Sequence, residues 1–311
     1  MTTIDINVSE VGPRDGLQNT KMFMPTAAKK AWITAEAAAG VREIEVCSFV
    51  STRLIPQFSD AEEIVAHALA IPGLTVAVLV PNLKGAERAI ATGAHKLTTT
   101  LSVSRAHSLA NVRKTPDEQL AEFRRIIDYR NAQPGPKPGV SAGLSTVFGC
   151  TLEGVIDERE VVRLAVGLAE AGADDVSLAD TVGYANPAQV KRIVRLVRAA
   201  IGDKLSDIHL HNTRGLGLAN AVAAIEEGIR TVDSSLAGLG GCPYAPGASG
   251  NIVTEDLVYM LEAMGLRTGI DLEKLIAVRA ILEEALPGAE MYGNVARAGV
   301  PKNYVAAKAA A

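Results

Sequence analysis

Residues 157–178, DEREVVRLAVGLAEAGADDVSL, predict a helix that leads directly into a buried strand. Apolar side chains recur at helical spacing over residues 157–170, and Gly172 suits the left-handed position that ends many helices. Residues 175–178 then form a short run that contains Val and Leu. A helix followed at once by such a strand is typical of a repeating βα unit.

The same order of elements repeats on both sides of this segment. Gly40, Gly93 and Gly172 each follow Ala or Thr, end a predicted helix and precede the next strand. Strands are predicted at residues 4–11, 43–49, 75–80, 96–103, 140–148, 175–178, 207–211 and 231–236. Helices are predicted between them at residues 26–39, 59–69, 83–91, 116–129, 157–170, 187–200 and 217–227.

Strict alternation of eight strands with helices favours an α/β fold of the (β/α)8 TIM-barrel type. Two doubly wound sheets of the Rossmann type are the alternative that this order leaves open. We predict one catalytic domain over residues 1–285, with a Gly-rich active-site loop at 238–251 and a short C-terminal extension of two helices, at 254–264 and 272–285. Residues 286–311 form a tail.

The composition excludes several classes of function. A net charge of -4 and 4% aromatic residues argue against a nucleic-acid-binding protein. Cys47, Cys150 and Cys242 form no CxxC pair, which indicates a reducing compartment rather than a disulfide framework. No apolar run reaches the ~18 residues of a membrane span, and no signal-peptide pattern begins the chain. We therefore expect a cytoplasmic protein that acts on a small molecule, without nucleic-acid or membrane partners.

Polar residues at strand ends are the first candidates for a site, because TIM barrels place their active sites there. The first predicted strand ends in EVGPRDGLQN, where Arg14 and Asp15 are adjacent. These two residues could also form a simple salt bridge on a polar loop. Glu43 and Glu45 share one face of the second strand, and a carboxylate inside a barrel needs a partner or a metal. Arg14 is the candidate partner for Glu45.

His209 and His211 lie two residues apart on the seventh predicted strand, so their side chains project to the same side. One of them could instead be a core histidine. With Asp15 nearby they would form a His/His/carboxylate set, which favours Mg²⁺ or Mn²⁺ and leaves Zn²⁺ or Fe²⁺ open. Asp180, at the end of the sixth strand, is a further candidate, although a carboxylate there can simply bind its own turn.

The Gly-rich segment at residues 238–251 lacks the GxxxxGK[ST] order of a phosphate-binding loop. We interpret it as a mobile lid that carries one thiol, Cys242. Its position among glycines predicts an exposed and reactive thiol, whereas Cys47 and Cys150 are expected to be inert packing residues.

These motifs resemble those of the hydroxymethylglutaryl-CoA lyase family, which belongs to the DRE-TIM metallolyase superfamily. The similarity extends from about residue 6 to residue 275 and is carried by VGPRDGLQN at 11–19, residues 48–50 and 56–57, PNLKG at 81–85 and DSSLAGLGGCPYAPGASGN at 233–251. The resemblance implies a metal-dependent retro-Claisen cleavage of a 3-hydroxyacyl-CoA, in which 3-hydroxy-3-methylglutaryl-CoA gives acetyl-CoA and acetoacetate. It also implies an acyl-CoA partner, a homo-oligomer such as a dimer, and a place in leucine degradation.

The resemblance also assigns roles to particular residues. The implied metal ligands are Asp15, His209, His211 and Asn251. The implied catalytic residues are Arg14, Cys242, His209, Glu45 and Asp180. Arg14 would stabilise the enolate, and Cys242 would enter catalysis when the lid closes. His209, Asp15 or a water is the candidate base. The implied substrate contacts are Arg14, Gln18, Lys21, Ser48 and Ser177.

Three departures from the family pattern leave the identity of the acyl group open. Asn212 replaces an Asp that follows the second histidine, which would retune the metal or the histidine orientation. Arg105 reverses a charge after the fourth strand, and Val46-Cys47 replaces two threonines. Citramalyl-CoA is therefore an alternative substrate.

Two other functions share part of this pattern. A condensing enzyme of the isopropylmalate or homocitrate synthase type has the same barrel and motifs, but would show Gly-Glu-Arg-x-Gly-Asn where this chain has residues 242–251. A non-catalytic barrel would have lost the metal or arginine positions, and both are present.

Overall fold

The strands of the chain close into a single barrel. The computed structural model describes residues 4–240 and 250–307. Its strands are β1 (Asn7–Glu10), β2 (Glu43–Ser48), β3 (Thr75–Leu79), β4 (Lys96–Ser102), β5 (Gly139–Ser145), β6 (Asp175–Asp180), β7 (Leu205–Leu210) and β8 (Thr231–Ser234). Each pairs in parallel with the next, and β1 also pairs with β8. The predicted (β/α)8 barrel is therefore confirmed, and two separate sheets are excluded.

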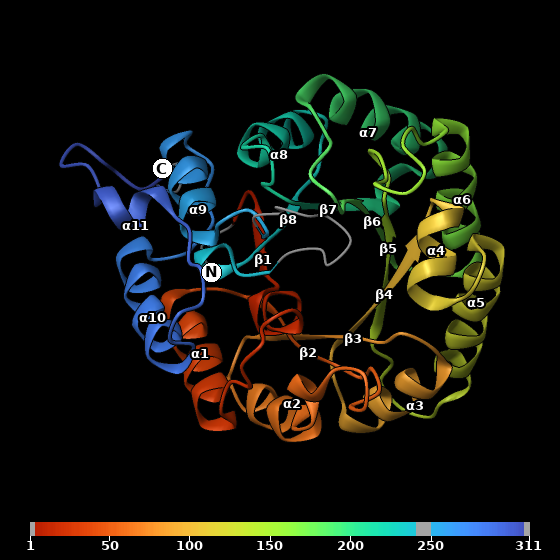
Figure 1. Ribbon diagram of the computed structural model, residues 1–311, viewed down its shortest axis with the longest axis horizontal. Helices are drawn as coiled ribbons and strands as arrows, with labels where there is room; N and C mark the ends of the chain where they lie inside the picture. Colours follow the sequence, from red (N-terminus) through yellow and green to blue (C-terminus); the bar gives the residue numbers. More distant parts are fainter. Residues whose placement is uncertain (1–3, 241–249, 308–311) are drawn as a thin grey trace.

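Helices surround this ring of strands (Figure 1). Those that follow β1 to β8 are α1 (Thr26–Ala39), α2 (Ala61–Leu69), α3 (Leu83–Thr92), α4 (Arg105–Val112) with α5 (Pro116–Ala132), α6 (Glu158–Ala171), α7 (Pro187–Ile201), α8 (Gly217–Glu226) and α9 (Thr254–Ala263). Short helical turns are η1 (Gly12–Gly16), η2 (Pro56–Phe58), η3 (Gly202–Lys204) and η4 (Leu236–Gly238). Among the described residues, no helix is long and apolar enough to cross a membrane.

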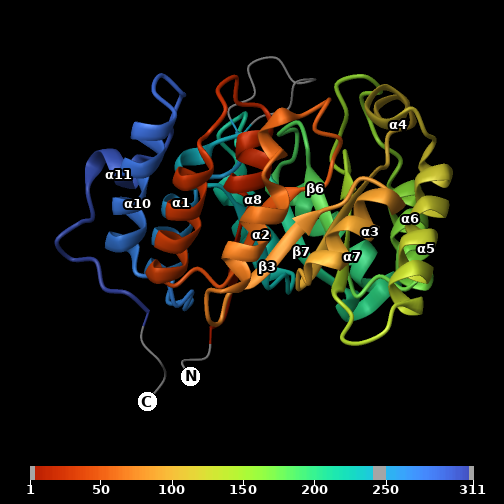
Figure 2. The ribbon, with the colours of Figure 1, turned by 90° about the horizontal axis from the view of Figure 1, so that it is seen from below.

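The C-terminal part of the chain packs on the outside of the barrel. Helix α10 (Leu272–Ala285) lies beside α1, as Figure 2 shows. The short α11 (Asn294–Ala298) follows in the predicted tail, where the amide groups of Asn294 and Val295 both donate to Asp256 at 2.8 Å. The two predicted C-terminal helices are thus confirmed, and the tail contains one further short helix.

Helix α4 is an element that the sequence analysis did not predict. Ser104 precedes it, and its hydroxyl accepts a hydrogen bond from the backbone amide of His107 at 3.1 Å, which caps the first turn. At the same end of the helix, the carboxylate of Glu153 accepts hydrogen bonds from the hydroxyl of Ser104 and the backbone amide of Ala106. Arg105 is the first residue of this helix. The charge at Arg105 therefore lies on a capped helix above β4 rather than on an irregular loop.

At the N-terminal end of the strands, the floor of the barrel interior holds one lysine surrounded by carboxylates. Lys96 Nζ lies 3.1 Å from Glu43, 3.4 Å from Asp207 and 3.7 Å from Asp175. These residues stand at or near the N-terminal ends of their strands. Burial, together with the neighbouring carboxylates, raises the pKa of Asp207 to about 8, although Lys96 opposes the shift. In TIM barrels this end of the strands serves stability, so Glu43 belongs to the floor of the barrel.

Glu10 joins the two strands at which the barrel closes. Its Oε1 accepts hydrogen bonds from the amides of Gly12 at 2.7 Å and Leu236 at 3.0 Å. Its Oε2 accepts from the hydroxyl of Thr254 at 2.7 Å. The Glu10 side chain is completely buried, so no water could accept hydrogen bonds from these donors in place of its carboxylate. Glu10 thereby fixes the turns that follow β1 and β8 against the start of α9.

We predict that Glu10→Ala destabilises the protein, whereas Glu10→Gln does not. Alanine leaves two buried amides without an acceptor, at about 1–3 kcal/mol each, so we expect urea unfolding to show a free energy of unfolding that is lower by about 2–6 kcal/mol. Glutamine keeps an oxygen on both amides, and its NH2 can donate to Thr254, whose hydroxyl lies 2.9 Å from Ser234. Equal stability of the alanine and glutamine variants would contradict this assignment.

Candidate active site

The turn after β1 holds Arg14 and Asp15 at the open end of the barrel. The η1 turn passes so close to Glu10 that a Cβ on Gly12 would lie 2.5 Å from its Oε1. Arg14 Nε donates to Glu45, and Arg14 Nη1 donates to Asp15 Oδ1 at 2.6 Å. Thr98 donates to the other oxygen of Glu45. The predicted pairing of Arg14 with Glu45 is therefore confirmed, and the guanidinium is held in one orientation.

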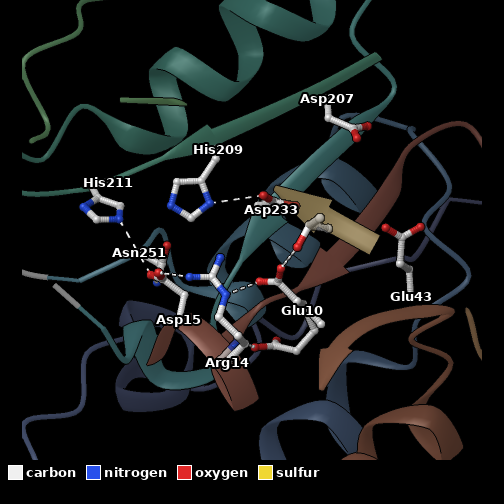
Figure 3. Close-up of polar contacts among 12 residues, drawn as sticks. Glu10, Arg14, Asp15, Glu43, Asp207, His209, His211, Asp233 and Asn251 are labelled. Carbon is white, nitrogen blue, oxygen red and sulfur yellow. Dashed lines mark hydrogen bonds and ion pairs between the residues drawn. The ribbon is translucent and has the colours of Figure 1, made fainter. Parts of the chain in front are cut away.

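The side chains of His209 and His211 point toward Asp15, as Figure 3 shows. His209 lies on β7 and His211 directly after it, with ring centres 5.1 Å apart. His211 Nε2 is 3.9 Å from Asp15 Oδ2. One ligand atom from each of Asp15, His209 and His211 lies within 4.8 Å of the others. The spacing of two residues thus places both rings on one side of the strand, as predicted.

Asn251 completes this group from the far end of the Gly-rich segment. Its backbone bridges to His211, and its Nδ2 donates to Asp15 Oδ2 at 2.8 Å and to the carbonyl of Leu239 at 3.0 Å. The Oδ1 atom is buried and has no hydrogen-bond donor among the described residues. An unpartnered oxygen beside two imidazoles and a carboxylate fits a divalent metal ion, which would supply the missing partner.

The protonation states of the site also suit a metal. Burial opposes the negative charge of Asp15, but Arg14 and both histidines lower its pKa to about 2. Burial, assisted by the nearby His209, lowers the pKa of His211 to about 4. An ionised carboxylate and a neutral imidazole are the forms that bind metal ions.

His209 has a partner that the sequence analysis did not single out. Its Nδ1 lies 3.1 Å from Asp233 Oδ2, and the two residues are register partners on β7 and β8. Burial disfavours the charged ring, but Asp233 and Asp15 outweigh it and raise the pKa of His209. The available signal was the alternation along β8, which points Asp233 into the barrel. Because Asp233 occupies Nδ1, the Nε2 atom is left to face Asp15.

Asp180 makes the contacts of a turn carboxylate. Its oxygens accept hydrogen bonds from the amides of Tyr184 at 2.8 Å and Ala185 at 3.1 Å. Burial raises its pKa to about 6 in spite of these bonds and of the positive charge of Arg214. Asp180 therefore orders the turn after β6, beside the histidines.

The expected substrate contacts are spread around the same end of the barrel. Ser48 ends β2, and its hydroxyl accepts from the Val50 amide at 3.2 Å. Ser177 lies on β6 and is buried. Gln18 is partly exposed and Lys21 is exposed in the segment between η1 and α1. These four residues are thus not brought into one cluster by hydrogen bonds among the described residues.

Two of the three cysteines lie within the described part of the chain. Cys47 and Cys150 are buried, as expected for packing residues, and burial raises the pKa of the Cys47 thiol well above its ordinary value. Cys242 lies outside the described residues, as does most of the predicted lid. Its reactivity therefore stays a prediction.

Asn212 acts on a helix rather than on the histidines. Its Oδ1 accepts a hydrogen bond from the amide of Gly217, the first residue of α8, at 3.0 Å. The expectation that this departure retunes the metal ligands is not supported by its contacts. The side chain satisfies a free amide at the start of the helix, which either Asn or Asp can do.

Known sequences share this arrangement over most of their length. The chain matches the HMGL-like family over residues 5–282. It is 40% identical to the hydroxymethylglutaryl-CoA lyase of Bacillus subtilis over 281 residues, and these residues cover 90% of this chain and 93% of that protein. The cytoplasmic 3-hydroxy-3-methylglutaryl-CoA lyase of Homo sapiens is 39% identical over 271 residues, which cover 87% of this chain and 72% of that protein.

Solved structures agree with the sequence comparison. An HMG-CoA lyase from Acinetobacter baumannii, in complex with coenzyme A and 3-methylmalate, matches with a TM-score of 0.90 and 42% identity over 98% of this chain and 99% of that chain. The carboxyl transferase domain of Rhizobium etli pyruvate carboxylase, with a TM-score of 0.69 and 17% identity over 94% of this chain and 50% of that chain, shares the fold alone. The chain therefore belongs to the HMGL-like family, and it is a carbon–carbon lyase.

Proposed function

We propose that the chain cleaves 3-hydroxy-3-methylglutaryl-CoA to acetyl-CoA and acetoacetate, with Mg²⁺ or Mn²⁺ as its cofactor. The observation that carries this proposal is the fixed guanidinium of Arg14 beside a group of metal-ligating side chains at one end of the barrel. The lyase names of relatives that are about 40% identical support the substrate.

The metal would be held by Asp15, His209 and His211, with Asn251 Oδ1 as a fourth ligand. This set supplies two imidazole nitrogens, one carboxylate oxygen and one amide oxygen. A divalent ion held by these residues would polarise the oxygen atoms of the bound substrate. The oxygen ligands favour Mg²⁺ or Mn²⁺, and the presence of two imidazoles favours Mn²⁺ over Mg²⁺ between them.

Arg14 would stabilise the enolate that forms when the C2–C3 bond breaks. Glu45 and Asp15 hold the guanidinium before substrate arrives, so no reorganisation is needed as negative charge develops on the thioester oxygen. A side chain of the site takes the proton of the 3-hydroxyl, and C2 takes up a proton to give acetyl-CoA. Cys242 in the Gly-rich segment is the proposed donor of this second proton.

The direct test is release of acetyl-CoA from a panel of thioesters that contains 3-hydroxy-3-methylglutaryl-CoA and citramalyl-CoA. We expect Mn²⁺- or Mg²⁺-loaded protein to cleave the first faster than the second. Removal of the metal with a chelator should abolish turnover, and adding Mn²⁺ back should restore it. No cleavage of any thioester by metal-loaded protein would overturn the proposal.

We expect Arg14→Gln to lower kcat by about 10²–10³-fold, the usual cost of one lost donor to a developing oxyanion. Mn²⁺ affinity, measured by calorimetry, should be unchanged or tighter because Arg14 repels the ion. Arg125→Gln, at an exposed pair with Glu122 on α5, is the matched control and should leave both quantities unchanged. Parallel loss of turnover and metal binding in Arg14→Gln would reassign this residue to a structural role.

Asp233→Asn should weaken Mn²⁺ binding by about 10–100-fold, because Asp233 orients the ring of His209 through Nδ1. Asp207→Asn is the matched control, since Asp207 lies two residues before His209 on β7 but belongs to the floor around Lys96. Calorimetric titration that gives equal affinities for the two variants would contradict the orienting role.

A further inference from the structure

Helix α1 buries a carboxyl group that the site does not use. Glu36 lies on α1 four residues after Trp32, so the two side chains share one face of the helix. That face packs on the η1 turn, because a Cβ on Gly12 would lie 2.7 Å from the ring of Trp32. The side chains of Trp32 and Glu36 are both completely buried. Glu36 therefore faces the turn that carries Arg14 and Asp15.

The carboxyl group of Glu36 has no donor and no cation beside it. Neither of its oxygens accepts a hydrogen bond among the described residues. The charged and titratable groups on the elements around α1 are engaged with other partners, Lys29 with Asp60, Lys30 with Glu63, His67 with Thr34 and Arg279 with Glu255. A buried carboxylate that has neither a donor nor a cation is strongly disfavoured, so the environment of Glu36 favours its neutral form.

Glu10 is the group that interacts most closely with Glu36. Its carboxylate accepts two backbone amides at Oε1 and one hydroxyl at Oε2. A carboxylate offers about four acceptor positions, so one position on Oε2 of Glu10 remains free. Burial raises the pKa of Glu36 well above its ordinary value, and the charges of Glu10 and Glu255 add to this shift, although Trp32 opposes it. A proton on Glu36 would supply the donor that Glu10 can still accept.

We propose that Glu36 keeps its proton in the folded protein and donates it to Oε2 of Glu10, so that one shared proton completes the junction of β1, β8 and α9. Glu10 is the ionised partner because three donors already stabilise its charge, whereas none stabilises a charge on Glu36. The other oxygen of Glu36 can then accept from the indole N–H of Trp32, which is buried and has no other acceptor among the described residues. The pair forms whether or not the chain acts as a lyase.

The shared proton makes the stability of the protein depend on pH. In the unfolded chain Glu36 titrates near its ordinary pKa of 4.5, whereas in the folded protein its pKa is higher. Between these two pKa values the folded protein binds one proton more than the unfolded chain, so a rise in pH favours unfolding. The contribution of Glu36 to stability is therefore full below its unfolded pKa and is lost as the pH rises toward its folded pKa. Within this window the unfolding constant increases about tenfold per pH unit.

The test compares the unfolding constant in urea of the unmodified protein with that of Glu36→Gln, between about pH 5.5 and about pH 7. Glutamine can donate to Glu10 through an N–H that does not titrate in this range. The ratio of the two constants, unmodified protein over variant, should rise about tenfold per pH unit, because the other titrating groups are common to both proteins. Glu170→Gln, at an exposed glutamate near the end of α6, is the matched control and should give a ratio that does not change with pH.

Infrared spectroscopy gives a second measurement of the same proton. The C=O stretch of a protonated carboxylic acid should be present in the unmodified protein and should lose intensity in Glu36→Gln. Glu36→Leu, which fills the same space without a polar atom, replaces the glutamine variant if that variant does not fold. A ratio of unfolding constants that is independent of pH, or an acid band that is unchanged in a folded variant, would overturn the inference and mean that Glu36 is ionised. Neither measurement uses a substrate, so failure of the lyase assay would overturn the proposed function alone.

Discussion

The hydrogen bonds of Glu10 are the interaction on which the site depends most directly. They connect the turn after β1 to the segment after β8 and to the first residue of α9, and they lie at the place where the sheet closes. Arg14 and Asp15 follow on one side of this junction, and Asn251 follows on the other. A small displacement of either turn would separate groups that must lie within a few ångströms of each other to act together.

The barrel interior shows a second constraint, which concerns how charge is distributed. Lys96 neutralises part of a buried carboxylate cluster at the floor, and Arg14 does the same for Glu45 and Asp15 near the mouth. Buried charges are stable only when they are paired, so every charged side chain in the interior occupies a defined place.

Much of the site was predictable because its parts are close in sequence. Arg14 and Asp15 are adjacent, and His209 and His211 are two residues apart, so a strand or a single turn already fixes their relative direction. The role of Asp233 was missed because it lies 24 residues from His209 and meets it only through the pairing of β7 with β8. Helix α4 was missed because its start depends on a cap from Ser104 and on the distant Glu153.

The sequence by itself determined the alternation of strands and helices, the barrel, the motifs of the family and the pairs that face one another locally. These features depend on periodicity and turn chemistry within short windows. The family motifs had already put Asn251 and Asp15 in one implied ligand set, but only the tertiary structure decided that Asn251 donates a hydrogen bond to Asp15, 236 residues away. It also decided that Asn212 binds α8 instead of supporting a histidine. It also decided that Thr100, Gly143 and Ser177 are neighbours across β4, β5 and β6. Such contacts follow from strand register and barrel closure, which no local window of sequence encodes.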